Sequence, residues 1–382
     1  MRANWRWVGA GIVTVAACIV LPMLWRHSMV DLKVYRLGGT TLLDQASALY
    51  DVRLAGTPLP FTYPPFAAVM MVPLALVPWP VAAVAWTAIT IVALVAIWRI
   101  SVKLPTALML LVVAASLLLE PVRETLGFGQ INLMLCALIL YDVLDVKHSR
   151  RGVWIGIAAG IKLTPLVFLG LLVVTRQWRA LAYATAAFAA TVLGGFAVAP
   201  TAATQYWTSL VSDATRVGGL AFASNQSWNG FLVRLHGDLD GGGTLWLALV
   251  ALTALAGLAL CRILWDRGER LAAVSTCALI GLFCSPVSWS HHWVWCIPLG
   301  VALLRRLTDR QKVAVGIFWF AIFTVAPIWW PPNHENRELH WSFPEQLAGN
   351  AYLIAAASAV ACLIAYSAKG SRHAVTSTCQ SV

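Results

Sequence analysis

Charged side chains are scarce in this sequence. Asp, Glu, Lys and Arg together make up 11% of the 382 residues, whereas a soluble domain carries about a quarter. Hydrophobic residues account for 60% of the chain, and the mean hydropathy is +0.76. This composition excludes a water-soluble globular protein, because such a protein needs far more polar surface.

Several other signals are missing as well. The eight cysteines form no Cys-x-x-Cys pair and lie mostly in apolar runs, which argues against a disulfide framework and against a zinc site. No basic arm with interleaved aromatic residues indicates nucleic-acid binding. Arg2 and Arg6 precede the first apolar run, but no small-residue cleavage site follows it. We therefore expect a first transmembrane helix and not a cleaved signal peptide.

Apolar runs long enough to cross a bilayer recur along the chain, and the 19 tryptophans suit membrane interfaces. No internal repeat or linker interrupts them, so we predict an all-α integral membrane protein with one domain over residues 1–382. The expected runs are 5–25, 81–98, 104–119, 131–146, 180–199, 244–264, 271–284, 290–304, 312–329 and 347–366. Two Pro-interrupted elements, 65–77 and 152–175, are expected to be re-entrant or juxtamembrane and a broken hairpin, respectively.

The distribution of Lys and Arg predicts the orientation. If neither Pro-interrupted element reverses the sidedness, 18 basic residues lie inside, eight lie outside, and Lys162 stays within the membrane. Both termini are then cytoplasmic, with about twelve crossings. The predicted outer loops are 26–64, 200–243 and 330–346, and the first is expected to hold a helix around Tyr35–Tyr50.

Eleven of the sixteen acidic residues fall on the outer side, and Asp31 is the first of them. An aspartate there is either a solvated loop residue beside a helix end or a functional group at the membrane surface. Lys162 precedes Pro165 in an interrupted helix, where irregular backbone is tolerated if it lines a cavity. Its ammonium is either functional or reaches an interface along its apolar stem.

A set of short motifs carries a resemblance. The early aspartate is followed by Tyr-Pro-Pro at 63–65, Gly-Gln-x-Asn at 129–132 and Gly-Ile-x-x-x-Ile-Lys-x-Thr-Pro at 156–165. Asn-Gln-Ser-x-x-Gly at 225–230 and Ser-Pro-x-Ser-Trp-x-His-His at 285–292 complete the set. Together these motifs resemble the actinobacterial polyprenyl-phosphate-mannose-dependent α-1,2-mannosyltransferases, which are membrane glycosyltransferases of the GT-C class.

The resemblance implies a GT-C fold with a large first outer loop. It implies inverting transfer of mannose from polyprenyl-phosphate-mannose to a phosphatidylinositol mannoside at the outer face of the cell membrane. The lipid-linked mannose donor is a substrate, and the sequence identifies no cofactor. An inverting step needs a base for the acceptor hydroxyl, and the family's catalytic aspartate corresponds to Asp31. It also needs cationic or hydrogen-bonding groups for the departing phosphate. The candidates for the phosphate are Lys162, His291, His292 and Arg123.

Sugar hydroxyls need uncharged donors and acceptors, and sugar rings stack on aromatic faces. The residues expected to contact sugar or acceptor are Gln130, Asn132, Asn225, Gln226, Trp228, Asn229 and Trp289. Asn and Gln pairs can instead cap helix ends. Neighbouring histidines on a helix point in different directions, so we expect no metal site at His291 and His292.

Other functions stay open at this point. A lipomannan-branching mannosyltransferase or a decaprenyl-phosphate-arabinose-dependent arabinofuranosyltransferase would share the same architecture. A lipid or sugar transporter would also have many spans and broken helices, but two similar halves would be expected, and the sequence has none.

Overall fold

The computed structural model describes residues 28–145, 150–239 and 242–378. The predicted first span at 5–25 lies outside these ranges. Within them the regular structure is helical, and β-structure is limited to one isolated bridge between Arg53 and Pro60. The all-α prediction is therefore confirmed for the part of the chain that is described.

The chain divides into two compact units. The first comprises the chain up to Leu169, Gln177–Gly219 and Ser290–Val294, and the second comprises Gly170–Arg176, Leu220–Trp289 and the chain from Trp295 onward. The single-domain prediction stays a prediction.

The first unit begins with the helices that follow the predicted first span. Its α-helices are α2 (Val30–Gln45), α3 (Pro65–Ala75), α4 (Trp79–Ser101), α5 (Thr106–Ser116), α6 (Glu120–Phe128), α7 (Asn132–Leu144), α8 (Val153–Ile161), α10 (Trp178–Val198) and α11 (Pro200–Thr208). Short 3₁₀ segments are η1 (Ala46–Ala48), η2 (Thr164–Leu166), η3 (Leu210–Ser212), η4 (Ala214–Val217) and η5 (Ser290–Trp295), and η5 extends one residue past this unit.

Helix α9 (Val167–Val174) runs from the first unit into the second. The remaining helices of the second unit are α12 (Trp228–His236), α13 (Gly243–Asp266), α14 (Arg270–Cys284), α15 (Cys296–Leu304), α16 (Asp309–Val325), η6 (Pro327–Trp329), η7 (Arg337–His340), α17 (Phe343–Gly349) and α18 (Ala351–Thr378).

Four of the described segments are long and apolar enough to cross a membrane. They are Trp79–Ser101, Trp178–Val198, Gly243–Asp266 and Asp309–Trp329. Two bent pairs of helices, α5 with α6 and α17 with α18, raise this number to six if each pair forms one span. The chain is thus a multi-pass membrane protein.

The predicted run at 104–119 is shorter and more bent than expected. Helix α5 ends at Ser116, and α6 starts at Glu120 in a direction that differs by 73°. Pro121 stands in the first turn of α6, where its missing N–H costs nothing, whereas inside a continuous helix it would remove a hydrogen bond. Because of the bend, α6 is a separate helix, and its polar residues do not continue the apolar helix α5.

Two other polar segments also fold differently from the prediction. The first helix of the 26–64 segment was expected around Tyr35–Tyr50, but α2 spans Val30–Gln45. It starts early because its apolar face, including Leu32 and Tyr35, is buried. The 200–243 segment, expected as a loop, contains α11 and α12. In contrast, the predicted break after Ile161 is confirmed, because α8 ends there and Lys162 has an extended backbone.

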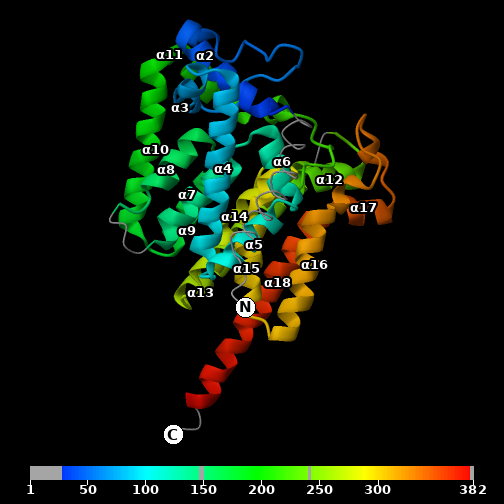
Figure 1. The fold of residues 1–382 in the computed structure, drawn as a ribbon. Coiled ribbons are helices and arrows are strands. Elements are labelled where there is room, and N and C mark those ends of the chain that lie inside the picture. The colour runs from blue at the N-terminus through cyan, green and yellow to red at the C-terminus, as the bar shows by residue number, and fades with distance from the viewer. Residues whose placement is uncertain (1–27, 146–149, 240–241, 379–382) are drawn as a thin grey trace, which may run out of the picture. The chain divides into compact units, whose positions relative to one another are not determined.

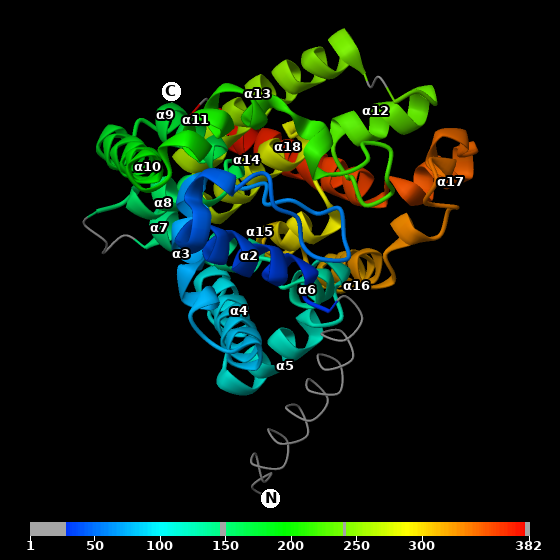
Figure 2. The same cartoon turned by 90° about the horizontal axis from the view of Figure 1, so that it is seen from above.

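Helix α8 packs closely on α10, and both figures of the fold show them side by side (Figures 1 and 2). Glycine recurs every fourth residue of this segment, at 152, 156 and 160, and each faces α10. A Cβ atom on Gly156 would lie 2.3 Å from the carbonyl oxygen of Ala184. This approach of two backbones needs small residues, as in membrane helix pairs generally. It holds α8 in place, and α8 ends directly before Lys162.

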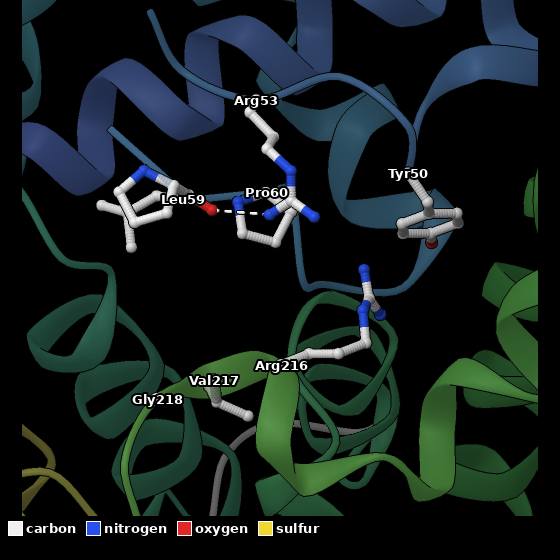
Figure 3. A pocket seen from close by; sticks show the side chains of 8 residues that line it. Tyr50, Arg53, Leu59, Pro60, Arg216, Val217 and Gly218 are labelled. Atoms are coloured by element: carbon white, nitrogen blue, oxygen red, sulfur yellow. Dashed lines mark hydrogen bonds between the residues drawn. The ribbon is translucent and has the colours of Figure 1, made fainter. Parts of the chain in front are cut away.

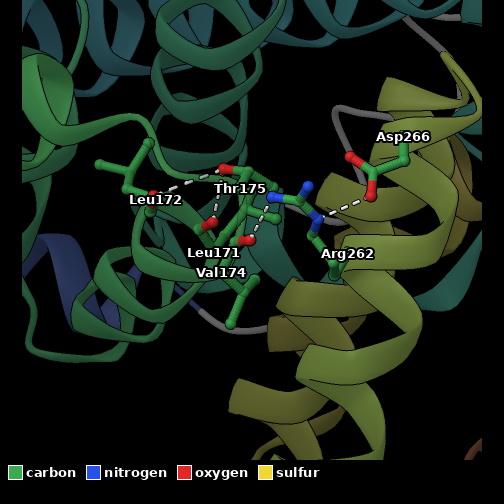
Figure 4. Close-up of polar contacts among 6 residues, drawn as sticks. All are labelled: Leu171, Leu172, Val174, Thr175, Arg262 and Asp266. Atoms are coloured by element: carbon green, nitrogen blue, oxygen red, sulfur yellow. Dashed lines mark hydrogen bonds and ion pairs between the residues drawn. The ribbon is translucent and has the colours of Figure 1, made fainter.

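In the second unit, Arg262 ties α13 to the end of α9 (Figure 4). Its Nη1 donates to the carbonyl of Val174 at 3.0 Å, and its Nε donates to the carboxylate of Asp266 at 2.6 Å. The hydroxyl of Thr175 donates to the carbonyl of Leu171 at 2.6 Å. The carbonyl of Val174, at the end of α9, is thereby satisfied by a side chain of α13.

We predict that Gly156→Ala destabilises the protein although alanine is the better helix former. The added methyl would collide with the backbone of α10, and overpacking of this kind costs about 1–3 kcal/mol. Gly194→Ala on α10 is the matched control, because the nearest atom to its added methyl lies 4.0 Å away. That control should be neutral or stabilising by up to about 1 kcal/mol. Thermal unfolding of both variants in detergent measures the difference, and equal stability would contradict the close approach.

Candidate functional site

Asp31 lies in the first turn of α2 and is half-buried. The helix starts after Met29, whose φ of 50° is left-handed and whose N–H donates to the carbonyl of Gly127 at 3.1 Å. This bond ties the start of α2 to the end of α6. A carboxylate in the first turn is favoured by the helix dipole, so the fold places Asp31 where its negative charge is stable.

Gly129 brings the Gly-Gln-x-Asn motif against α2. It ends α6 in a left-handed conformation with φ of 72°, which glycine adopts at little cost. A Cβ atom at this position would lie 2.6 Å from the Cβ of Leu32. Because glycine allows both the turn and the contact, the following residue, Gln130, reaches the side chain of Asp31.

Gln130 connects Asp31 to two tyrosines. Its Nε2 donates to Oδ2 of Asp31 at 2.8 Å, while its Oε1 accepts from the hydroxyl of Tyr35 at 2.8 Å and from that of Tyr63 at 3.3 Å. The two tyrosine hydroxyls are 2.9 Å apart. Since a carboxylate only accepts hydrogen bonds, the tyrosines hold the amide in the orientation that serves Asp31.

Both tyrosines remain neutral donors at physiological pH. Burial raises the pKa of Tyr35 and of Tyr63 well above the usual value, and the negative charge of Asp31 acts in the same direction.

The carbonyl of Tyr63 accepts a hydrogen bond from the hydroxyl of Tyr50 at 2.8 Å. Tyr63 is thus held by its hydroxyl to Tyr35 of α2 and by its carbonyl to Tyr50, which follows α2.

Lys162 points its ammonium at polar groups. Its Nζ donates to Oδ1 of Asn132 at 3.0 Å and lies 3.0 Å from Nε2 of His292. It also lies 5.8 Å from the centre of the Tyr63 ring, a distance that suits a cation–π contact. An ammonium has no acceptor, so Nε2 of His292 accepts and the proton of its neutral ring is on Nδ1.

His291 contributes its backbone to the same cluster. Its carbonyl accepts from Nδ2 of Asn132 at 2.9 Å and from the hydroxyl of Thr125 at 3.1 Å. The imidazole of His291 is buried, and its ring stands nearly perpendicular to that of His292 with centroids 4.8 Å apart. Of the two histidines, His292 is the one that touches Lys162.

These contacts join one negative and one positive group in a common cluster. Tyr63 links the two, because its hydroxyl contacts Gln130 and its ring lies under Lys162, and Asp31 and Lys162 attract each other electrostatically. Five residues singled out from the sequence thus lie in one network through their side chains, together with the backbone of His291. They are Asp31, Gln130, Asn132, Lys162 and His292.

Arg123 has a different environment. It is half-buried on α6, and its Nη1 donates to the carbonyl of Leu118 at 2.8 Å. This bond satisfies a carbonyl at the bend between α5 and α6. A role of Arg123 toward phosphate stays a prediction.

The predicted sugar-binding amides of the second unit hold its own loops together. Oδ1 of Asn225 accepts from the N–H of Ser288 at 2.9 Å, and Nε2 of Gln226 donates to the carbonyls of Ala223 and Gly349 at 2.8 and 2.7 Å. Nδ2 of Asn229 donates to the carbonyl of Pro286 at 3.3 Å. The Asn-Gln-Ser and Ser-Pro-x-Ser motifs therefore meet through these bonds.

The two tryptophans of these motifs are each half-buried. Trp228 donates from Nε1 to the hydroxyl of Thr253 at 2.9 Å, and its ring lies 5.0 Å from that of Phe283. Trp289 makes an edge contact with Phe222 at 6.1 Å. Their contact with sugar stays a prediction.

Sequence reasoning missed Tyr35, Tyr63 and Thr125 as members of the cluster. Tyr35 lies four residues after Asp31 and thus on the same face of α2, and Tyr63 opens the Tyr-Pro-Pro motif. Both signals are present in the sequence. Thr125 had no such signal, because its partner is a backbone carbonyl 166 residues away.

No group of three or more His, Cys, Asp and Glu side chains is placed to hold a metal ion among the described residues. The donors that line the Asp31–Lys162 cluster are amides, phenols, an ammonium and an imidazole. These groups suit hydrogen bonding to hydroxyls and phosphate oxygens. The arrangement can accept a proton at Asp31 and stabilise a developing anion at Lys162.

Comparison with known proteins identifies relatives along most of the chain. A protein of Mycolicibacterium smegmatis named polyprenol-phosphate-mannose-dependent alpha-(1-2)-phosphatidylinositol pentamannoside mannosyltransferase is 37% identical over 361 residues, which cover 90% of this chain and 87% of the relative. A Mycobacterium tuberculosis protein with the same name is also 37% identical, over 84% of this chain and 80% of the relative.

A second Mycobacterium tuberculosis relative is named polyprenol-phosphate-mannose-dependent alpha-(1-2)-phosphatidylinositol mannoside mannosyltransferase. It is 34% identical, with coverage of 91% of this chain and 87% of the relative. No solved structure matches the chain. Residues 61–286 match glycosyltransferase family 87, and with relatives this similar over nearly its whole length the chain belongs to that family.

Proposed function

We propose that the protein is an inverting α-1,2-mannosyltransferase that moves mannose from polyprenyl-phosphate-mannose to a phosphatidylinositol mannoside. The names of the relatives support this donor and this acceptor. The observation that carries the chemistry is the cluster in which Tyr63 contacts both Lys162 and Gln130, the partner of Asp31. A single displacement needs this pairing of a base with a cation.

In the proposed step, a carboxylate oxygen of Asp31 takes the proton of the acceptor 2-hydroxyl. The hydroxyl oxygen attacks the anomeric carbon of the donor mannose and forms the new glycosidic bond. The bond between that carbon and the phosphate oxygen breaks, and polyprenyl phosphate leaves with the electron pair. Gln130, held by Tyr35, supports the base, because its amide donates to Oδ2 and orients the carboxylate.

Lys162 is proposed to bind the phosphate of the donor, and His292 is proposed to position the ammonium of Lys162. The ammonium balances the charge that grows on the leaving oxygen, and Asn132 holds the ammonium in place through its Oδ1. Asn132 is itself fixed by the carbonyl of His291. His292 can donate to a phosphate only through a ring N–H, so we assign it a positioning contact to Lys162 and the phosphate contact to Lys162 itself.

The amides of the second unit are assigned a structural role, because they are buried and bonded to backbone groups. We propose sugar contact for Trp289, which keeps part of its ring exposed. The same is proposed for Trp228, although its ring packs on Phe283.

The proposed architecture is a GT-C fold with about twelve crossings in a single domain and a large first outer loop. The active site lies on the extracytoplasmic side of the cell membrane, and both termini lie in the cytoplasm. The support for this sidedness is the distribution of 18 basic residues against eight. Residues 26–64, 200–243 and 330–346 are the outer segments of this arrangement.

Cysteine labelling tests the sidedness. Gly56 and Gly268 form a matched pair, since each is exposed with φ of 75° or 77° and has no atom within 4 Å of an added Cβ. We expect a membrane-impermeant maleimide to label Gly56→Cys in intact cells and Gly268→Cys only after permeabilisation, relative to the unmodified chain. The reverse pattern would overturn the orientation.

We expect Asp31→Asn to lower mannosyl transfer by roughly 10²–10⁴-fold, the contribution of general-base catalysis. Asparagine can still accept the hydrogen bond from Gln130, so folding and substrate affinity should change little. Turnover with purified lipid donor and a phosphatidylinositol mannoside acceptor is the measurement. The exposed residues Asp44, on the same helix, and Asp51 are the controls, and their asparagine variants should stay near normal. Normal turnover of a folded Asp31→Asn protein would remove Asp31 as the base.

Lys162→Ala should raise KM for the lipid donor more than KM for the acceptor. Loss of one charged hydrogen bond to phosphate corresponds to a rise of roughly 10- to 100-fold. Lys33→Ala is the matched control, because Lys33 lies over the ring of Trp79, outside the cluster. A larger effect on the acceptor would assign Lys162 to the other substrate.

A further inference from the structure

A polar cavity lies in the first unit, beside the segment that leads to Tyr63. Its volume is about 390 Å³, and its walls come from the segment between α2 and α3 and from the segment after α11 (Figure 3). Two arginines, Arg53 and Arg216, line it together with Tyr50 and the loop residues Pro58, Leu59, Pro60, Val217 and Gly218.

The cavity has a strong positive character. The guanidinium groups of Arg53 and Arg216 point toward one another across it (Figure 3), and no acidic residue is among the described residues that line it. Two like charges that line the same cavity repel each other. An anion between them would turn this repulsion into attraction.

Both guanidinium groups are held in place by backbone carbonyls. Nη1 of Arg53 donates to the carbonyl of Pro58 at 2.7 Å, and Nη2 of Arg216 donates to the carbonyl of Phe61 at 3.2 Å. Arg216 also lies over the ring of Tyr50, 5.5 Å from its centre. A guanidinium has five N–H donors, so each bond to a carbonyl uses one and leaves the fork available to a ligand.

The cavity is connected to the Asp31–Lys162 cluster through Tyr50. The ring of this residue supports Arg216, and its hydroxyl donates to the carbonyl of Tyr63 at 2.8 Å. Tyr63 contacts Gln130 and Lys162. A ligand bound in the cavity therefore lies beside the segment that carries Tyr63 into the cluster.

We propose that this cavity binds a phosphate group of a lipid substrate, as an anion site separate from the one at Lys162. Paired guanidinium forks match phosphate oxygens in geometry and charge. A volume of about 390 Å³ is at the small end of ligand pockets, which suits a phosphate head group. The inference rests on the proposed function for the identity of the lipid, but binding of phosphate itself is independent of it.

Direct titration tests the site. The probes are glycerophosphoinositol, a soluble phosphodiester, and inorganic phosphate, with neutral myo-inositol as the comparison, each added to the full chain in detergent. We expect both anions to bind and inositol not to. Arg53→Gln and Arg216→Gln should weaken anion binding by roughly 10- to 100-fold, and Arg216→Lys should fall between these variants and the unmodified protein, because it keeps the charge without the fork.

Arg36→Gln is the matched control. Arg36 belongs to α2 and donates one N–H to the carbonyl of Val77 at 3.0 Å, outside the cavity. Like the Arg53 and Arg216 variants, Arg36→Gln removes a guanidinium that donates to a backbone carbonyl, but this one does not line the cavity. Equal anion binding by the Arg36, Arg53 and Arg216 variants would overturn the proposal, and so would equal binding of inositol and glycerophosphoinositol.

Kinetics with the lipid substrates identify the source of the phosphate. A rise in KM for the phosphatidylinositol mannoside in the Arg53→Gln variant assigns the cavity to the acceptor phosphodiester, and a rise for the lipid donor assigns it to polyprenyl phosphate. Unchanged KM for both lipids would overturn the assignment to a lipid substrate. If the unmodified chain transferred no mannose, the proposed function would fail, while the titration would still report on the anion site.

Discussion

The hydrogen bond from Gln130 to Asp31 is the contact on which the candidate site depends. It forms because α6 ends in a left-handed glycine that touches Leu32, which brings the next residue against the first turn of α2. The tyrosines on the other side of the amide decide which of its ends faces the carboxylate. If the amide of Gln130 were turned the other way, its Oε1 would face the carboxylate of Asp31, and two hydrogen-bond acceptors would meet.

Lys162 imposes a second constraint of the same kind. An ammonium in a largely apolar protein needs acceptors, because an unpaired buried charge is very costly. The extended backbone after Ile161 turns the side chain toward Asn132 and His292, and the close packing of α8 on α10 fixes where the helix ends. The glycine spacing and the polar cluster are therefore linked, because the packing of α8 on α10 determines where the ammonium of Lys162 lies.

Buried amides serve different purposes in the two units. Gln130 and Asn132 bond to ionisable side chains, whereas Asn225 and Gln226 bond to backbone groups of neighbouring loops. The two pairs cannot be distinguished by residue type. The difference arises because loops without regular structure leave many N–H and carbonyl groups to be satisfied, and the Asn-Gln-Ser segment lies among such loops. In the arginine cavity the roles are exchanged. There, backbone carbonyls position charged side chains, those of Arg53 and Arg216, at the edge of a cavity.

The sequence by itself determined the helical membrane class, the break at Lys162 and the candidate residues Asp31, Gln130, Asn132, Lys162 and His292, since each follows from composition, from proline or from short motifs. It misplaced the first helix of the 26–64 segment, treated 200–243 as a loop and left Tyr35 and Tyr63 out of the site. Only the tertiary structure decided which polar residues meet, because partners such as Asp31 and Gln130 are 99 residues apart in the chain. Local propensity carries no information at that separation, and packing of α2, α3, α6 and α7 in one unit supplies it.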